Sequence, residues 1–504
     1  MPTLSVTTRS SAEIAADALV VGALRGSDGP ELAPGHGLPR QAEVHLQAVL
    51  AALDATGDLG EVHRVVSVPG VRATTVVVAG LSRSEAAEPD AATIRRAAQC
   101  AVKSVASKAA VAIALPAGDL ARVAAAAEGA YAGCYSFVKP TRSARGRTAA
   151  LTASGSRTKI TVVSGAGQAK PVKDAVARAA VLGAAQDWVR DLVNAPPNLL
   201  YPQSFTEAVK SRVAASSAKV TLSILDEKAL VKGGFGGIVG VGQASSRPPR
   251  MVTMTYSPQG ARGSVALVGK GITFDTGGVN LKPVTAMLGM KADMAGAAAV
   301  AAAVLAAAEL GLPITVRGYL CLAENMPGGH AQRPNDVVIM RNGTSVEILD
   351  TDAEGRMVLG DGLSLAAEAQ PDVIVDIATL TGIQQIALGR IAAVMGNDDD
   401  FRADVLDAAA TAGEDAWPMP LPEQLRSKLD SQVADLAHKG DRDGGMLTAA
   451  IFLRHFVPQG VPWAHLDIAG PAFNDTPGPY GEGRGATAYG VATLLRLLEA
   501  RARA

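Results

Sequence analysis

Two short acidic segments contain the residue types best suited to hydrolytic chemistry. In the first, the apolar run SVALVG at 264–269 leads directly into Lys270, and Asp275, Lys282 and Asp293 follow it. Ligands of open α/β sheets bind just outside the carboxyl ends of the strands. We therefore expect 264–269 to form a strand and the loop after it to face a binding crevice.

The second segment, VEILDTDAEGRM at 346–357, repeats this order of an apolar strand followed by a polar turn. Asp350, Asp352 and Glu354 lie in the turn, and Arg356 opens the helix that follows. Residues two apart point to the same side of an extended chain, so Asp352 and Glu354 are expected to continue the strand and act together. Two such loops at strand ends can meet in one crevice.

Four carboxylates in one crevice would need cations, because their mutual repulsion raises their pKa values and destabilises the fold. The four are those of Asp275, Asp293, Asp352 and Glu354. With a neighbouring amine, four carboxylates can hold two divalent ions about 3.5–4 Å apart. Neither segment contains histidine, so the donors are mostly oxygen, which suits Mn, Mg or Zn.

A simpler interpretation treats these acids as solvated loop residues that pair with nearby Lys and Arg side chains. The candidate partners are Lys270, Lys282, Lys291 and Arg356. From spacing alone, Lys270 is expected to be a salt-bridge partner. At pH 7 the loss of its proton costs about 4–5 kcal/mol, and only metal binding could offset that cost.

The elements that position these segments are predicted to form two α/β domains. A chain of 504 residues exceeds the ~250 residues at which single domains usually stop growing. Short β-branched runs alternate with Ala-rich stretches over 1–168, which predicts a smaller N-terminal α/β domain. A helical pattern over 169–193, followed by Pro196 and Pro197, is expected to link the domains. The remainder, 194–504, is predicted to be a larger α/β/α domain with a mixed, largely buried sheet.

The composition argues against several classes of protein. Lys plus Arg (47) nearly balances Asp plus Glu (48), so the chain lacks the basic field of most nucleic-acid-binding proteins. Cys100, Cys134 and Cys321 form no C-x-x-C pair, which argues against a disulfide framework or a thiolate zinc site. The first residues do not resemble a signal peptide, and the apolar stretch 297–312 is too short for a membrane span. A cytoplasmic protein without a membrane partner is expected.

Other catalytic motifs are incomplete or absent in the sequence. GKGITF lacks the third glycine of a dinucleotide-binding fingerprint, and neither G-x-x-x-x-G-K-[ST] nor G-x-S-x-G occurs. The seven histidines form no H-E-x-x-H, and His465, within apolar WAHLDIA, is expected to be a hydrogen-bonded core residue. The glycine-rich segment 232–250 is predicted to be a loop.

Taken together, VGKGITFDTGGxxLKP, MKADMAGAAAV and DTDAEGRM closely resemble the leucyl aminopeptidase (cytosol aminopeptidase) family, bacterial type. RDLVNAPPN at 190–198, ATLTG at 378–382 and WAHLDIAG at 463–470 support the match, which spans 190–504. The resemblance implies a metal-dependent aminopeptidase that releases N-terminal amino acids, preferring Leu or another apolar residue. It also implies a homohexamer.

The family's metal ligands carry over to this sequence residue by residue. The tight site would be formed by Lys270, Asp275, Asp293 and Glu354. The exchangeable site would be formed by Asp275, Asp352 and Glu354. Lys270 would then be a neutral ligand, in place of the salt bridge expected from spacing. The two divalent ions are expected to be Mn or Zn, with Co or Mg as alternatives.

In the implied mechanism, the substrate amine binds one ion and a metal-bridging water attacks the scissile carbonyl. Lys282 would stabilise the oxyanion, and Arg356 would hold a bicarbonate that transfers a proton to the leaving amine. Lys282 and Asp293 would also contact the substrate. Four further residues are expected to shape the substrate pocket: Met290, Thr379, Leu380 and Gly382.

Asp350 departs from the family, in which Asn is usual at this position close to the substrate backbone. Its extra charge is expected to alter pH dependence or substrate preference. The alternative function is a DNA-binding or architectural role, which some bacterial relatives combine with peptidase activity. The basic segment 138–148, with Arg142, Arg145 and Arg147, supports this role, whereas the near-zero net charge opposes it.

Overall fold

The computed structural model describes residues 1–83, 88–140, 157–478 and 483–503. The chain divides into two compact units, one of Met1–Lys139, Ala153–Asp187 and Thr476–Arg484, the other of Pro140–Thr152, Trp188–Asp475 and Gly485–Ala504. Helix α4 (Lys170–Asn194) belongs to both units, because the division falls between Asp187 and Trp188. The domain limits expected from the sequence lie at the two ends of this helix.

The first unit is built on a seven-stranded sheet of order β1-β7-β6-β2-β5-β4, with β3 paired to β2. Neighbours from β1 to β5 in this order are parallel, whereas β3 and β4 pair antiparallel to β2 and β5. The strands are β1 (Thr3–Thr7), β2 (Ala18–Gly26), β3 (Gly29–Leu32), β4 (Val62–Val66), β5 (Thr75–Gly80), β6 (Ala110–Ala114) and β7 (Lys159–Val163).

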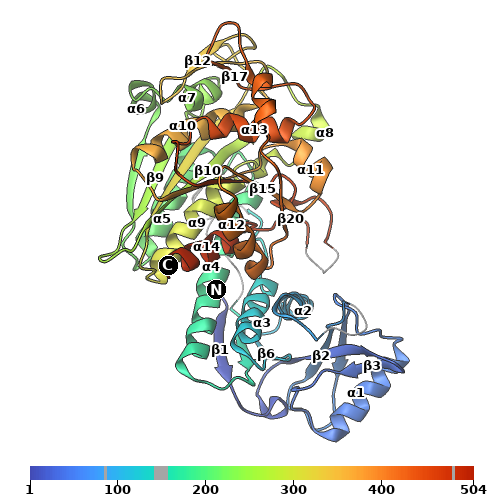
Figure 1. Ribbon diagram of the computed structural model, residues 1–504. Coiled ribbons are helices and arrows are strands. Elements are labelled where there is room, and N and C mark those ends of the chain that lie inside the picture. The colour runs from blue at the N-terminus through green and yellow to red at the C-terminus, as the bar shows by residue number, and fades with distance from the viewer. Residues whose placement is uncertain (84–87, 141–156, 479–482, 504) are drawn as a thin grey trace. The chain divides into compact units, whose positions relative to one another are not determined.

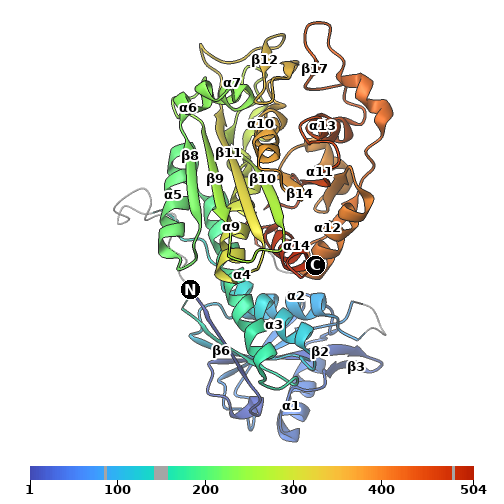
Figure 2. The same cartoon turned by 60° about the vertical axis from the view of Figure 1, so that its left-hand side comes forward.

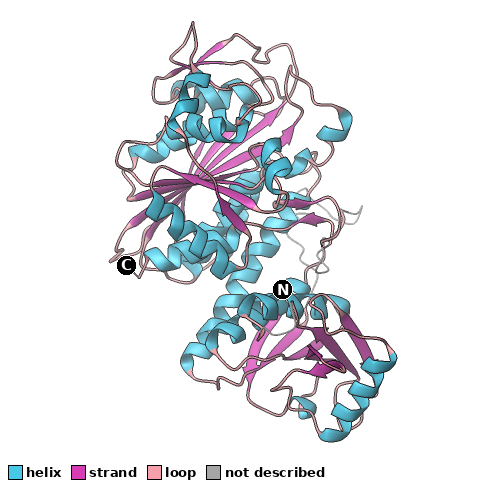
Figure 3. Ribbon diagram, turned by 45° about the vertical axis from the view of Figure 1, so that its right-hand side comes forward, coloured by secondary structure: helices cyan, strands magenta, loops and turns pink. Residues whose placement is uncertain are grey.

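Both faces of this first sheet are covered, which explains its continuous apolar runs. Val20 and Val77 belong to a core that includes residues of α2 (Ala91–Ser104) and α3 (Leu120–Gly133). Their neighbours Leu19 and Val76 belong to a second core that includes α1 (Arg40–Ala52). Successive strand residues point to opposite faces, so the helices form two layers around the sheet (Figure 3).

The second unit contains an eight-stranded mixed sheet of order β16-β15-β18-β14-β10-β11-β9-β8. The central strands β18, β14, β10 and β11 are parallel, whereas β15 and β9 run antiparallel to β18 and β11. The strands are β8 (Thr221–Leu225), β9 (Arg250–Tyr256), β10 (Ser264–Asp275), β11 (Thr315–Asn325), β14 (Val373–Ala378), β15 (Ala392–Gly396), β16 (Ala416–Pro418) and β18 (Trp463–Asp467). A small sheet joins β12 (Val337–Ile339), β13 (Ser345–Glu347) and β17 (Leu436–Ala437), and β19 (Phe473–Asn474) pairs with β20 (Gly485–Ala486).

Helices cover both faces of the second sheet (Figures 1 and 2). On strand β10, a Cβ added to Gly269 would lie 2.5 Å from the Cα of Ala297, so this residue faces α9 (Ala295–Glu309). The adjacent Val268 faces α10 (Glu354–Glu368), where its Cγ1 would lie 2.7 Å from a Cβ on Gly362. The predicted α/β architecture with a mixed sheet is therefore confirmed.

The remaining helices of the second unit complete these layers. They are α5 (Pro202–Ala215), α6 (Glu227–Lys232), α7 (Gly236–Gly242), α8 (Val284–Met287), α11 (Gly382–Leu388), α12 (Asp399–Ala412), α13 (Gly445–Arg454) and α14 (Val491–Arg501). The prediction of a loop over 232–250 was wrong in part, because α7 lies within this segment. Its glycines serve close packing: a Cβ on Gly236 would lie 2.0 Å from the carbonyl oxygen of Ile339.

The stretch Val284–Glu309 is long and apolar enough to cross a membrane by length and composition, but 94% of its most apolar window is buried inside the protein. Most of this stretch is α9, whose residues from Ala295 to Ala308 are all buried. It packs as a buried helix against β10, β11 and β14.

Candidate metal centre

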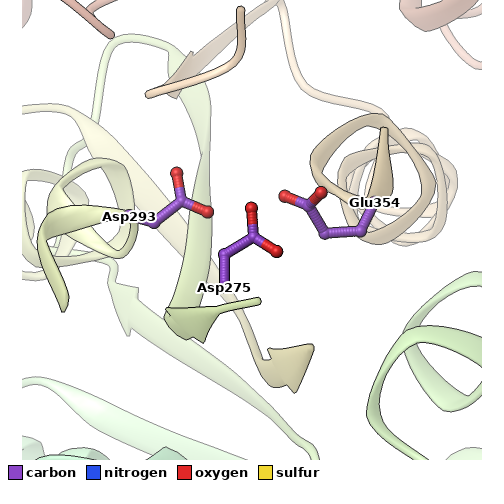
Figure 4. Close-up of side chains that lie close together, drawn as sticks. All are labelled: Asp275, Asp293 and Glu354. Carbon is purple, nitrogen blue, oxygen red and sulfur yellow. The ribbon is translucent and has the colours of Figure 1, made fainter. Parts of the chain in front are cut away.

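Asp275, Asp293 and Glu354 converge in the interior of the second unit (Figure 4). One carboxylate oxygen from each lies within 4.8 Å of the others, and all three side chains are buried. Asp275 ends β10, Asp293 follows the short 3-10 helix at Met290–Ala292, and Glu354 begins α10. Two of these positions are where a strand ends or a helix begins, which is where α/β folds present functional groups.

The backbone around these acids differs from the sequence expectation in two ways. β10 does not end at Gly269 but continues to Asp275, with a register shift against β11 between Ile272 and Asp275. Asp352 and Glu354 do not share an extended segment, because Asp352 lies in a turn and Glu354 is already helical. The i,i+2 argument for these two residues was therefore wrong.

Lys270 lies among the three buried acids. Its Nζ is 2.8 Å from Asp293 Oδ1 and 2.9 Å from Glu354 Oε1, and it donates a hydrogen bond to the carbonyl oxygen of Thr379 at 2.9 Å. Burial opposes the ammonium form, but the charges of Asp293 and Glu354 outweigh it and raise the pKa of Lys270. A Cβ on Gly355 would lie 2.6 Å from Lys270 Cε, so a larger residue there would displace the end of the Lys270 side chain.

Lys282 joins Asp352 to the same group. Its Nζ lies 2.9 Å from Asp275 Oδ2 and 2.5 Å from Asp352 Oδ1. Burial disfavours the charged amine, but Asp275 and other acids raise its pKa. Lys282 therefore carries a positive charge at neutral pH and links the buried acids to the half-buried Asp352.

The charges of this group are unbalanced in a way that suits divalent cations. Four carboxylates face only two ammonium groups. Burial and the neighbouring acids raise the pKa values of Asp275, Asp293 and Asp352. Asp293 Oδ2 and Glu354 Oε2 are buried and have no hydrogen-bond partner in the part of the chain that the structure describes. A buried charged oxygen without a partner costs free energy. A bound cation would remove that cost, so these carboxylates suit a metal site.

Two polar residues that the sequence interpretation missed hold Asp275 in place. Asn325, at the end of β11, donates from Nδ2 to Asp275 Oδ1 at 2.8 Å and to the carbonyl oxygen of Thr351 at 3.1 Å. Thr351 Oγ1 donates to the carbonyl oxygen of Gly277 at 2.6 Å. Asn325 ends a strand adjacent to β10, and this position was the signal that could have identified it.

His438 and Lys439 were also missed, and both contact the second acidic segment. His438 is buried and its carbonyl oxygen accepts a hydrogen bond from Arg356 Nη1 at 3.0 Å. Lys439 Nζ pairs with Asp350 Oδ2. Burial favours a higher pKa for Asp350, but the hydrogen bonds from Lys439 and from the backbone N–H of Asp352 lower it, so the extra carboxylate is ionised at neutral pH.

The residues expected to shape the substrate pocket lie at different distances from this centre. Thr379 reaches it directly, with Oγ1 donating to Asp293 Oδ1 at 2.7 Å. The backbone N–H of Leu380 donates to Asp467 Oδ1 at 3.1 Å, and Gly382 is the exposed first residue of α11. Met290 is half-buried in the 3-10 helix that precedes Asp293.

His465 is a buried core residue, as predicted. Its Nδ1 lies 2.5 Å from Asp376 Oδ1, and Trp463 Nε1 donates to Asp376 Oδ2 at 2.7 Å. The basic segment offered for DNA binding lies mostly outside the described residues, because its arginines fall within 141–156.

Comparison with known proteins gives one consistent result. The family model described as "Cytosol aminopeptidase family, catalytic domain" matches residues 187–495, and the one described as "Cytosol aminopeptidase family, N-terminal domain" matches residues 20–143. A "Probable cytosol aminopeptidase" of Streptomyces coelicolor is 46% identical and covers 99% of this chain and 98% of its own. The "Probable cytosol aminopeptidase" of Micrococcus luteus is 48% identical, and the match covers 100% of this chain and 99% of the relative.

Two solved structures are similar over nearly the whole chain. "Bottromycin maturation enzyme BotP in complex with Mn" has a TM-score of 0.82 at 38% identity and covers 97% of this chain and 100% of its own. "Tomato leucine aminopeptidase mutant - K354E" has a TM-score of 0.84 at 29% identity, and the match covers 99% of this chain and 97% of that structure's chain. The chain therefore belongs to the cytosol aminopeptidase family and is a peptidase of the aminopeptidase type.

Proposed function

We propose that this aminopeptidase releases Leu or another apolar residue from the amino terminus of peptides, using two divalent cations. Mn or Zn are the preferred ions, with Co and Mg as alternatives. The observation that carries the proposal is the convergence of three buried carboxylates, two of which, those of Asp293 and Glu354, have an oxygen without a hydrogen-bond partner among the described residues. The structural relative solved in complex with Mn supports the choice of a divalent metal.

The ligand assignment follows the grouping of side chains around the two lysines. One ion would be held by Lys270, Asp275, Asp293 and Glu354. The other would be held by Asp275, Asp352 and Glu354. Lys270 Nζ already lies within 3 Å of an oxygen of Asp293 and of Glu354. As a ligand it must lose a proton, so metal binding and deprotonation would be coupled.

Two divalent cations bound there would polarise the scissile carbonyl and lower the pKa of the attacking water. Lys282 lies at the edge of the centre between Asp275 and Asp352. A lysine of ordinary pKa, about 10.4, is protonated at pH 7, so Lys282 would act as a fixed positive charge that stabilises the oxyanion.

Arg356 would bind an anion such as bicarbonate beside the reacting groups. It lies in the first turn of α10 and is buried, with Nη1 held by His438. Burial lowers the pKa of Arg356 to about 10, so the guanidinium stays charged at pH 7. Its charge and the helix amino terminus both favour an anion, which would accept and return the proton needed by the leaving amine.

Substrate recognition would combine the centre with the surrounding backbone. Asp293 and Lys282 would contact the substrate's main chain, and Asp350 would lie near it. The apolar first side chain would contact the pocket residues Met290, Thr379, Leu380 and Gly382. A free amino terminus is required if the substrate amine is itself a metal ligand, which gives exopeptidase rather than endopeptidase action.

Homohexameric assembly and a cytoplasmic location are further parts of the proposal, and the resemblance to the family supports both. Light scattering on the full-length protein as it elutes from a gel-filtration column tests the assembly. A mass corresponding to six chains supports it, and a monomer or dimer contradicts it.

The activity is tested with leucine p-nitroanilide after chelation and after adding back Mn, Zn, Co or Mg. Turnover is expected only with added metal and only for the free amine, so N-acetyl-leucine p-nitroanilide should not be cleaved. The variant that tests the proposed ligand Glu354 is Glu354→Gln, which should lose turnover. Its matched control is Glu368→Gln, because Glu368 ends the same helix with a half-exposed side chain. No turnover with any metal, or equal cleavage of the acetylated substrate, would contradict the proposal.

A further inference from the structure

Asp350 uses both oxygens of its side chain, each for a different partner. Oδ1 accepts a hydrogen bond from the backbone N–H of Asp352 at 3.0 Å, and Oδ2 pairs with Lys439 Nζ. The backbone carbonyl oxygen of Asp350 accepts hydrogen bonds from the N–H of Ala353 at 3.0 Å and from His438 Nε2 at 2.8 Å. The turn that presents Asp352 is therefore held on one side by its own backbone and on the other by residues 438 and 439.

The chain that carries Lys439 is fixed to this turn over several residues. β17 pairs in parallel with β13, with Leu436 opposite Val346 and Ala437 opposite Glu347. The pairing continues into the turn, because the N–H of His438 donates to the carbonyl oxygen of Glu347 at 3.1 Å. The backbone at Lys439 is therefore held close to the turn by the pairing of the residues that precede it.

The imidazole of His438 completes this attachment. Nε2 faces the carbonyl oxygen of Asp350, which can only accept, so Nε2 carries the proton. Nδ1 then accepts from the N–H of Leu349 at 3.1 Å. Burial, reinforced by the charge of Arg356, lowers the pKa of His438 to about 4, which agrees with a neutral ring that serves as a structural link.

We propose that Lys439 is a positioning residue, whose ion pair with Asp350 orients the turn so that Asp352 can act as a ligand of the exchangeable metal site. This inference rests on the proposed two-metal function. It concerns a residue whose ion pair is with Asp350 and not with one of the proposed metal ligands. Lys439 acts through Asp350, because the same carboxylate that it holds also accepts the N–H of Asp352.

The pairing explains why an acid is accommodated at position 350. An asparagine there could offer the same oxygen to the N–H of Asp352, but its second polar atom would be an amide donor. That donor would face the Lys439 ammonium, so the ion pair could not form. Asp350 and Lys439 therefore match each other, and the effect of changing Lys439 should depend on which residue occupies position 350.

The test is a double-mutant cycle read by Mn²⁺ binding, using calorimetry on the chelated full-length protein. Lys439→Met is expected to weaken the exchangeable site about tenfold and to leave the tight site unchanged. In the Asp350→Asn background the same change should alter affinity less than twofold. Lys439→Arg should retain wild-type binding. Lys210→Met is the matched control, because it removes an ion pair within α5, to Glu207 at 2.9 Å, that shares no residue with the turn or with the segment that carries Lys439.

The possible results separate the inference from the proposed function. If the wild type binds neither Mn²⁺ nor, in the same titration, Zn²⁺, Co²⁺ or Mg²⁺, both are overturned. If the wild type binds two ions but Lys439→Met changes nothing, only the inference is overturned. Tighter binding in Lys439→Met would also overturn it, since that is the result for a lysine that merely repels the cation. An equal loss with and without the Asp350→Asn change would show that Lys439 does not act through Asp350.

Discussion

Lys270 and Glu354 form an ion pair in the interior of the second unit, with 2.9 Å between Nζ and Oε1. One residue lies within β10 and the other begins α10, so the pair joins the sheet to the helix layer. In the proposed function both become ligands of the same ion. Occupation of that site would therefore exchange a proton of Lys270 for a metal ion.

This exchange predicts that Mn²⁺ binding releases protons. The raised pKa of Lys270 means that the free protein is protonated at that site at pH 7, so occupation of the tight site should release about one proton. Affinity should then rise about tenfold per pH unit. Calorimetry in buffers of different ionisation enthalpy measures the release. Binding without proton release would show that Lys270 stays an ammonium ion.

Lys282→Met should separate metal binding from turnover. If Lys282 is a fixed charge that stabilises the oxyanion, its loss should lower kcat about 10²- to 10³-fold and leave both ions bound. Lys228→Met, which changes a lysine on the exposed helix α6, is the control. A loss of metal together with activity would instead assign Lys282 a structural role between Asp275 and Asp352.

Gly296→Ala should destabilise the second unit. A Cβ at this position would lie 2.1 Å from the carbonyl oxygen of Ile377, so α9 would have to move away from β14. Overpacking of this kind costs about 1–3 kcal/mol. Gly329→Ala is the control, because among the described residues nothing lies within 4 Å of its Cβ position. Thermal unfolding should show a lower Tm for Gly296→Ala alone.

Asp361 should make stability depend on pH. This buried residue accepts hydrogen bonds from the N–H groups of Ile238 and Arg341, yet burial raises its pKa from 3.8 to about 7. The folded state binds the proton more tightly than the unfolded state, so the cost of ionisation develops as pH rises from about 4 to about 7 and is complete above that.

Asp361→Asn removes this ionisation. Its stability relative to the wild type should therefore improve by up to about 4 kcal/mol between pH 4 and pH 7. Urea unfolding of the metal-free proteins at several pH values measures this difference. A difference that stays constant over this range would show that Asp361 has an ordinary pKa.

The convergence of the acidic segments could be predicted because each follows an apolar strand of an α/β pattern. Where β10 ends could not be predicted from the local pattern. Its apolar run stops at Gly269, but pairing with β11 extends the strand until Asp275 lies opposite Asn325. The helical start at Glu354 was likewise missed, because the spacing of Asp352 and Glu354 alone does not distinguish a turn from a strand.

The supporting residues were missed for a different reason. Asn325 reaches Asp275 across 50 positions, and Lys439 reaches Asp350 across 89. Neither belongs to a motif of recognisable spacing, so its role depends on which segments the fold brings together. The residues that form recognisable motifs are those proposed to bind metal or act in catalysis, whereas the residues that hold them in place become visible only in three dimensions.

The most direct test of the account is the number of Mn²⁺ ions bound per chain, measured by equilibrium dialysis and elemental analysis. A centre of two metal ions predicts two ions for the wild type, one for Asp352→Asn, and loss of the tight site in Glu354→Gln, with hydrolysis of leucine amide only in the fully loaded protein. A wild-type protein that hydrolyses leucine amide with no bound metal, or an Asp352→Asn variant that still binds two ions, would contradict it.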